Sequence, residues 1–120
     1  MLDIAAIGLA LCLNTGVINC DEINYEYDSS MKRDGVNGVT LLYKNSGKQL
    51  IRVSSQYKNN EHVLKNILVH ELAHAHAQQQ GKSLNHNRRH LKVFKDACKT
   101  LTTNLKTTDR NICKKEANYG

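Results

Sequence analysis

The sequence predicts an α+β fold in one domain that spans residues 1–120. Two segments in the second half have the apolar periodicity of helices, and segments in the first half alternate like strands. The chain is long enough for one hydrophobic core, and its 40% apolar and 23% charged content is typical of a globular protein. We therefore expect an N-terminal helix, a small three-stranded antiparallel or mixed sheet, a long central helix and a C-terminal helix.

The N-terminal helix is expected over Ile4 to Leu13, an uncharged apolar run that Asn14-Thr15-Gly16 ends. This run is too short to cross a membrane, and it lacks the positive charge that precedes the apolar core of a signal peptide. We therefore expect a buried helix in a cytoplasmic protein that does not contact a membrane. Secretion is the alternative, if residues 1–20 act as a signal peptide.

The four cysteines are Cys12, Cys20, Cys98 and Cys113. No two of them are spaced as Cys-x-x-Cys, so they do not form a zinc ribbon. An even number would allow disulfides in a secreted protein, but a cytoplasmic location favours reduced thiols. We expect reduced thiols.

Strands are expected in three segments of the first half. Ile23 to Tyr27 alternates apolar and polar residues like a half-buried strand. Val36 to Tyr43 and Lys48 to Ser54 follow, and a turn at Asn45-Ser46-Gly47 joins them as a hairpin. The alternation in the third segment is imperfect, which leaves its register open.

The central helix is expected to begin after the N-cap Asn60 and to end at a C-cap, Gly81. One stripe of this helix, at spacings of three and four residues, consists of Val63, Ile67, His70, His74 and Ala77. The two histidines therefore continue an apolar face. Buried imidazoles need partners, and one metal ion satisfies both at once.

His70 and His74 also belong to the motif His-Glu-x-x-His. Residues four apart lie one above the other on a helix, so both imidazoles can bind the same ion. Glu71 lies about 100° further round. From there a carboxylate can take a proton from a water that the metal activates, without becoming a ligand itself. A chance coincidence on a solvated helix is the alternative, and the apolar stripe argues against it.

A catalytic zinc usually takes three protein ligands and keeps one position for water, so a third ligand must follow downstream. The spacing of one large class of zinc peptidases would need a histidine at position 80, where Gln80 stands. Glu116 is the only glutamate after Glu71 and lies almost at the end of the sequence. His62 is too far along the helix axis, and His76 lies across the helix from His74.

His86 and His90 remain as candidates for the third ligand. A second helix is expected from near Asn87, because an apolar stripe follows: Phe94, Ala97, Cys98, Leu101 and Leu105. His90 lies one turn before Phe94 on the same face, so packing would fix its imidazole against the central helix. His90 is therefore favoured, and His86, in the preceding loop, is the alternative.

The stretch from Ile67 to Ala75, with His90-Leu91-Lys92-Val93-Phe94-Lys95 sixteen residues after His74, resembles the SprT-like zinc metallopeptidases, which include the Spartan proteases. These proteins share a His-Glu-x-x-His helix and a later His-Gly-x-x-Phe-type segment that gives the third zinc ligand. The resemblance covers residues 48 to about 101. Leu91 replaces the usual glycine, and the paired Cys-x-x-Cys zinc ribbon of many members is missing.

The resemblance implies a minimal zincin-like fold and peptide hydrolysis, in some members of proteins bound to DNA. We therefore expect a zinc-dependent endopeptidase in which His70, His74 and His90 bind Zn²⁺ and Glu71 is the catalytic base. A protein or peptide substrate would add as a strand along the sheet edge near Lys48–Ser54. A tyrosine such as Tyr43 or Tyr57 would stabilise the oxyanion, and nothing in the sequence selects one.

The net charge of +6 is spread unevenly. Residues 1–30 contain five acidic residues and no lysine or arginine, whereas Lys82 to Lys115 contains ten basic residues against Asp96 and Asp109. Such a basic half indicates either nucleic-acid contact or an ordinary solvated surface. The alternative function is thus a nucleic-acid-binding or partner-binding module with a structural zinc, closed by a fourth ligand such as His86. We expect a monomer.

Overall fold

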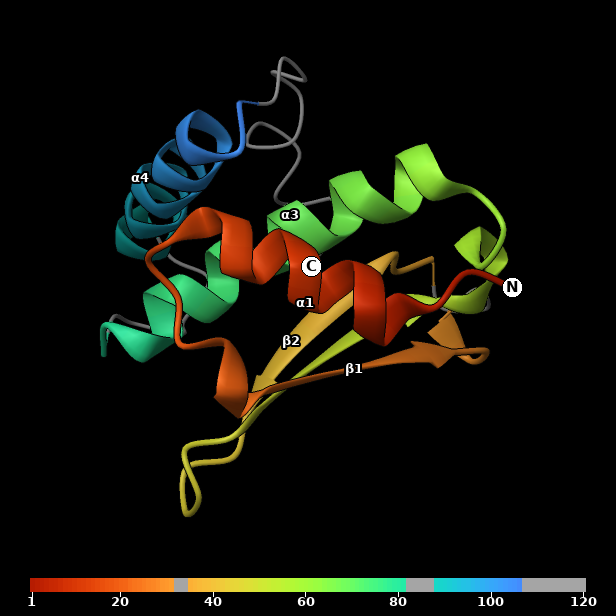
Figure 1. Cartoon of the computed structure of the whole chain (residues 1–120). Coiled ribbons are helices and arrows are strands. Elements are labelled where there is room, and N and C mark those ends of the chain that lie inside the picture. Colours follow the sequence, from red (N-terminus) through yellow and green to blue (C-terminus); the bar gives the residue numbers. More distant parts are fainter. Residues whose placement is uncertain (32–34, 82–87, 107–120) are drawn as a thin grey trace.

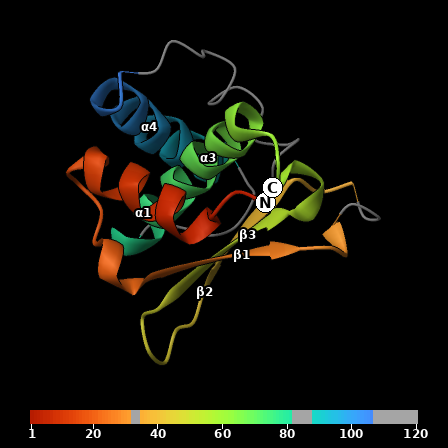
Figure 2. The same ribbon diagram turned by 45° about the vertical axis from the view of Figure 1, so that its right-hand side comes forward.

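A computed structural model describes residues 1–31, 35–81 and 88–106, and for residues 88–91 the backbone alone. In the described part, the helices α1 (Ile4–Thr15), α3 (Glu61–Gln79) and α4 (Arg88–Asn104) all lie on one side of a three-stranded sheet (Figures 1 and 2). Short 3₁₀ turns, η1 (Cys20–Glu22) and η2 (Ser55–Tyr57), precede β1 and follow β3. The predicted α+β fold is confirmed.

The ends of α1 and α3 follow from their capping residues. In α1, the Asp3 side chain accepts a hydrogen bond from the backbone of Ala6, and Gly16 ends the helix with a φ of 69°. Asn60 caps α3 by accepting from the backbone N–H of Val63, as predicted. At the other end Gln80 is the C-cap, one residue before the predicted one, and Gly81 follows it with a φ of 70°. Both helices were therefore predicted to within one or two residues.

The sheet consists of β1 (Ile23–Asp28), β2 (Gly38–Leu42) and β3 (Gln49–Ser54) in the order β1-β3-β2. β3 pairs in parallel with β1 and antiparallel with β2, so the sheet is mixed and both sides of β3 are occupied. The predicted addition of a substrate strand along Lys48–Ser54 is therefore wrong, because the backbone groups of this segment already pair with neighbouring strands. Among the described strands, the free edges belong to β1 and β2.

The outer edge of β2 is defined by its register. At its two ends, the Tyr43 N–H donates to Lys48 and the Ser54 N–H donates to the carbonyl of Asn37. Backbone groups alternate in direction along an antiparallel strand. The N–H and C=O groups of Gly38, Thr40 and Leu42 therefore point away from β3, towards the free edge.

The core lies between the sheet and the helices. From β3, Ile51 and Val53 point to the helices and are fully buried. They meet the apolar side chains of α3, and α4 closes the far side of that helix with buried Phe94, Ala97 and Leu101. α3 is therefore covered by the sheet, α1 and α4, and from Leu68 to Ala75 every one of its residues is buried.

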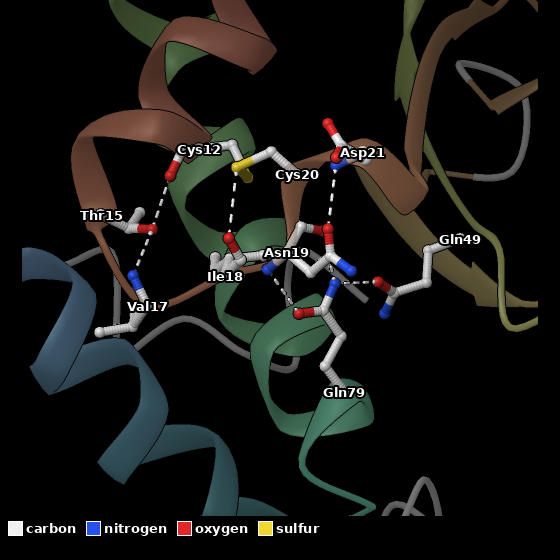
Figure 3. The surroundings of a disulfide bond; sticks show 9 residues. All are labelled: Cys12, Thr15, Val17, Ile18, Asn19, Cys20, Asp21, Gln49 and Gln79. Carbon is white, nitrogen blue, oxygen red and sulfur yellow. Dashed lines mark hydrogen bonds between the residues drawn. A yellow bond between two sulfur atoms is a disulfide. The ribbon is translucent and has the colours of Figure 1, made fainter.

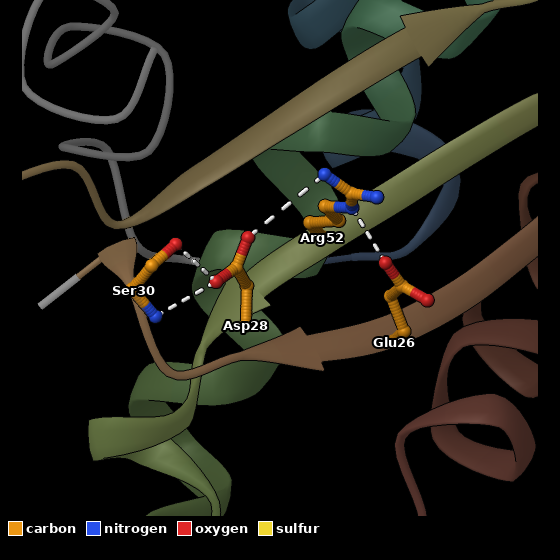
Figure 4. Close-up of polar contacts among 4 residues, drawn as sticks. All are labelled: Glu26, Asp28, Ser30 and Arg52. Carbon is orange, nitrogen blue, oxygen red and sulfur yellow. Dashed lines mark hydrogen bonds and ion pairs between the residues drawn. The ribbon is translucent and has the colours of Figure 1, made fainter.

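The opposite face of the sheet carries charged side chains. There Arg52 of β3 forms ion pairs with Glu26 and Asp28 of β1, and Ser30 donates to the Asp28 carboxylate (Figure 4). The hydrogen bonds from Ser30 lower the pKa of Asp28, and the hydrogen bond to Glu26 raises the pKa of Arg52. Exposed pairs of this kind contribute little to stability. This face of the sheet is therefore a solvated surface.

The prediction of reduced thiols is wrong. Cys12 of α1 and Cys20 of η1 form a disulfide across a sequence separation of 8 residues (Figure 3), and Cys98 is disulfide-bonded too. The sequence argument failed because it inferred the thiol state from the expected compartment, whereas the turn at Gly16 brings the two chain segments together. Disulfides are typical of oxidising compartments, so the thiol state no longer supports the expected cytoplasmic location. None of the helices in the described ranges is both long and apolar enough to cross a membrane.

Next to this disulfide, three amide side chains form a hydrogen-bonded group with the backbone of Asn19, and we call this group the amide network: Gln49, Gln78 and Gln79. The buried Gln49 side chain donates to the Ala75 carbonyl (3.0 Å) and to Gln78 (2.8 Å), and its oxygen accepts from Gln79 (2.8 Å). Gln79 also exchanges two hydrogen bonds with the backbone of Asn19 (Figure 3). The amide network thus joins the C-terminal end of α3 to β3 and η1.

Candidate metal and catalytic site

His70 and His74 lie next to each other in the buried middle of α3. Their exposed fractions are 0% and 6%, and their ring centroids are 5.1 Å apart with the ring planes at 65°. The two residues are four positions, or about one helical turn, apart, so both imidazoles lie on the same side of α3. The structure therefore brings together the two histidines that the sequence predicted as metal ligands.

Phe94 of α4 packs against both imidazole rings. Its ring centroid lies 4.5 Å from that of His70 and 4.4 Å from that of His74, and it is stacked on His74 at 29°. Phe94 itself is almost completely buried. This aromatic contact restricts the orientations of both imidazoles, which is what a metal site needs from its surroundings.

Glu71 is fully buried and points to β2 rather than to α4. The Thr40 hydroxyl lies 2.8 Å from Glu71 Oε1 and 3.0 Å from the Glu71 carbonyl oxygen. The neighbouring Gly38 leaves room for this carboxylate: an added Cβ there would lie 3.1 Å from Oε2 and 2.9 Å from the Cγ2 atom of Ile67. The carboxylate is thus enclosed between α3 and the strand that forms a free edge of the sheet.

The position of the predicted third ligand is described in part. His90 lies in the first turn of α4, so its backbone is placed, whereas its side chain lies outside the described residues. The alternative, His86, lies outside them altogether. Of the two rejected histidines, His62 is exposed in the first turn of α3, and His76 is buried near its end, where desolvation lowers its pKa.

Among the described side chains, the two imidazoles of His70 and His74 are suitable zinc ligands. Imidazole nitrogens are common zinc ligands, and buried histidines one turn apart supply two of them. Among the side chains of residues 1–31, 35–81 and 92–106, no group of three or more His, Cys, Asp or Glu is placed to hold a metal ion. The two candidates for a third ligand, His90 and His86, both have side chains outside that description.

The two tyrosines proposed for an oxyanion role lie away from the middle of α3. Tyr43 follows β2 in the hairpin and is half-exposed, and its backbone pairs with Lys48. Tyr57 lies in η2, before α3 begins, and its hydroxyl donates to the Asn37 side chain (2.9 Å). The structure therefore gives no reason to assign the oxyanion role to either tyrosine.

The basic segment from Lys82 to Lys115 lies largely outside the described residues. Of its lysines, Lys92, Lys95 and Lys99 are exposed on α4. Their spacing of three and four places them on one side of that helix, opposite the buried Phe94.

Sequence reasoning missed the contribution of β2 to this site. Gly38 and Thr40 contact Glu71, but neither was singled out, because strand and helix are far apart in the sequence. A weak signal was present: Gly38, Thr40 and Leu42 share one face of the strand, and a glycine on a buried face often marks a close approach by another segment.

Comparison with known proteins adds a family to this geometry. The model of the SprT-like family matches residues 16–114, which is most of the chain. Searches of curated proteins and of solved structures give no significant match. From the extent of the family match we conclude that the chain belongs to the SprT-like family, a membership that indicates a zinc metallopeptidase.

Proposed function

We propose that this protein is a zinc-dependent endopeptidase. The observation that carries the proposal is the buried cluster on α3, in which two imidazoles face Phe94 while the glutamate between them in sequence faces β2. A structural role for two histidines needs no adjacent buried carboxylate, whereas hydrolysis needs both ligands and a base. Membership in the SprT-like family supports the same reaction class.

His70, His74 and His90 are the proposed zinc ligands. His90 is chosen because it precedes Phe94 by one helical turn, and the Phe94 ring contacts both of the other histidines. Residues four apart lie on the same side of a helix, so position 90 of α4 lies on the side that faces α3. Bound zinc would lower the pKa of a water molecule and polarise a peptide carbonyl.

Glu71 is the proposed general base. Its carboxylate would accept a proton from the attacking water and then transfer that proton to the leaving amine of the substrate. The full burial of Glu71 limits its access to bulk water. Its contact with β2 places it beside the strand along which we propose that the substrate binds.

The proposed substrate is an extended peptide that pairs with the outer edge of β2. There the N–H and C=O groups of Gly38, Thr40 and Leu42 point away from the sheet, which is the arrangement that strand addition requires. The Thr40 carbonyl now accepts a hydrogen bond from the Gln78 side chain (3.3 Å). A substrate N–H that pairs with this carbonyl would have to share it with Gln78 or replace it.

The test is proteolysis of a casein-type substrate by the full chain, with Glu71→Gln as the decisive variant. The amide keeps the size of the side chain but cannot accept the proton, so we expect the rate to fall roughly 10²- to 10⁴-fold while zinc content stays at that of the wild type. Glu61→Gln is the matched control, because Glu61 is exposed on the first turn of the same helix, where it forms an ion pair with Lys65. An active Glu71→Gln protein would refute the mechanism, and a metal-free one would make Glu71 a ligand or a structural support.

The same preparations assign the third ligand. His90→Ala is expected to lose zinc and activity together, because two protein ligands rarely hold a catalytic zinc. His86→Ala is expected to keep both. If His86→Ala releases zinc and His90→Ala retains it, the third ligand is His86.

A further inference from the structure

The Thr40 hydroxyl of β2 contacts Glu71 in two places. It lies 2.8 Å from the carboxylate oxygen Oε1 and 3.0 Å from the backbone carbonyl oxygen of the same residue. Both distances are in the range of an O–H···O hydrogen bond or close to it. The hydroxyl of one strand residue, Thr40, therefore contacts both the side chain and the backbone of one helix residue, Glu71.

The position of this hydroxyl is fixed by the sheet and by the residue type. Thr40 lies opposite Ile51, which is fully buried on the central strand, and its neighbours Val39 and Leu41 pair with β3, so the backbone of Thr40 is fixed between them. A β-branched side chain has few χ1 rotamers, so the hydroxyl direction is restricted as well. Two residues earlier, a Cβ added at Gly38 would lie 3.1 Å from the other carboxylate oxygen of Glu71, so the glycine leaves room for the carboxylate. One face of β2 is thus fitted to the carboxylate at two successive positions.

We propose that Thr40 is a positioning residue that holds the Glu71 carboxylate in its working orientation. The inference rests on the proposed function, because Glu71 needs a fixed orientation only if it acts on a bound substrate. A glutamate side chain has three rotatable bonds, and a base must come within hydrogen-bond reach of the proton that it takes. A carboxylate has about four lone-pair positions, so the hydrogen bond from Thr40 does not by itself use up its capacity to accept that proton.

The same residue also connects Glu71 to the proposed substrate strand. The Thr40 side chain faces Glu71, while its backbone N–H and C=O point to the free edge of β2. A peptide that pairs with this edge would therefore bind to the residue that orients the base. In this arrangement Thr40 would position both reactants: its backbone would bind the substrate, and its hydroxyl would orient the Glu71 carboxylate.

Two substitutions separate the hydroxyl from the packing of the side chain. Thr40→Val keeps the branched shape and removes the hydroxyl, whereas Thr40→Ser keeps the hydroxyl and removes a methyl group. In the zinc-loaded full chain we expect Thr40→Val to lower kcat roughly 10- to 100-fold, with KM within about threefold of wild type and zinc content unchanged. Thr40→Ser should recover most of kcat. Thr100→Val is the matched control, because Thr100 is exposed on α4 and its hydroxyl donates to the backbone carbonyl of Asp96 in the same helix.

A second readout does not depend on catalysis. In protein labelled with ¹³C at the glutamate carboxyl carbons, the Glu71 resonance, assigned by its absence in Glu71→Gln, should shift in Thr40→Val and return in Thr40→Ser. Thr40→Ala serves in place of Thr40→Val if the valine variant does not fold. Wild-type kcat in Thr40→Val, or an equal loss in Thr40→Ser, would overturn the proposal in an active enzyme. If the wild type shows no peptidase activity, the proposed function fails. The Glu71 resonance then decides alone whether Thr40 orients Glu71, and an unchanged resonance in Thr40→Val would overturn the proposal for Thr40.

Discussion

The middle and the C-terminal end of α3 both present polar side chains to neighbouring segments, but the chemistry at the two places differs. In the middle, His70, Glu71 and His74 are titratable groups, buried within two turns of one helix. At the end, the amide network consists of neutral carboxamides that donate to and accept from one another, donate to backbone carbonyls and accept from the backbone N–H of Asn19. Neutral amides paired in this way stabilise a structure, whereas buried titratable groups in contact are typical of functional sites.

The comparison shows that a hollow in the surface does not by itself locate a reaction site. A hollow of about 510 Å³ lies at the end of α3, and the described residues that line it include Gln78 and Gln79 but not His70, Glu71 or His74. The residue types, rather than the size of the hollow, identify the middle of the helix as the candidate site. Substitutions in the two regions should therefore differ: those at the end should lower stability, and those in the middle should lower activity.

The largest expected effect on stability comes from the disulfide that holds η1 beside the amide network. Replacing both cysteines, Cys12→Ala with Cys20→Ala, frees a loop that the bond closes in the unfolded chain, so the free energy of unfolding should fall by about 2–3 kcal/mol. Zinc content should stay the same, because the bond lies away from the middle of α3. The measurement is chemical denaturation of the double variant and the wild type. Intact mass after alkylation checks the bond, and wild-type protein that alkylates at Cys12 and Cys20 without reduction would contradict it.

A smaller effect is expected from the centre of the amide network. Gln49→Leu keeps a side chain of similar size but removes the hydrogen bonds to Ala75, Gln78 and Gln79, and we expect a loss of about 1–3 kcal/mol in the free energy of unfolding. Gln79→Ala, at an exposed position, should cost less. Denaturation curves measure both variants, with kcat and zinc content as the second readout. A Gln49→Leu protein that keeps its stability but loses zinc or kcat would remove the distinction between the two regions.

The sequence was sufficient to predict the elements and the hairpin, but not where β1 joins the sheet. α3 and its N-cap followed from long helical periodicity, and the hairpin followed from alternation around Gly47. The order β1-β3-β2 did not follow, because parallel pairing of β1 with β3 depends on contacts between residues 26 positions apart. This is why the sequence predicted a substrate edge on β3, which the sheet order places in the middle of the sheet.

The candidate site shows the same limit. His70, Glu71 and His74 could be grouped from the sequence, because one helical turn separates the histidines. The packing of Phe94 against both rings could be anticipated in outline from the inward stripe of α4. Thr40 could not be found, because its contact with Glu71 spans 31 residues and exists only once the strand and the helix are packed.

The most direct test of the account is X-ray absorption at the zinc edge of the zinc-loaded full chain. The account predicts one zinc per chain with three imidazole nitrogens and one oxygen at about 2.0–2.1 Å, falling to two imidazoles or to loss of the metal in His90→Ala. An open position of this kind separates a catalytic site from a structural one. A fourth protein ligand, a sulfur ligand near about 2.3 Å, or a chain that binds no zinc would contradict the proposed peptidase.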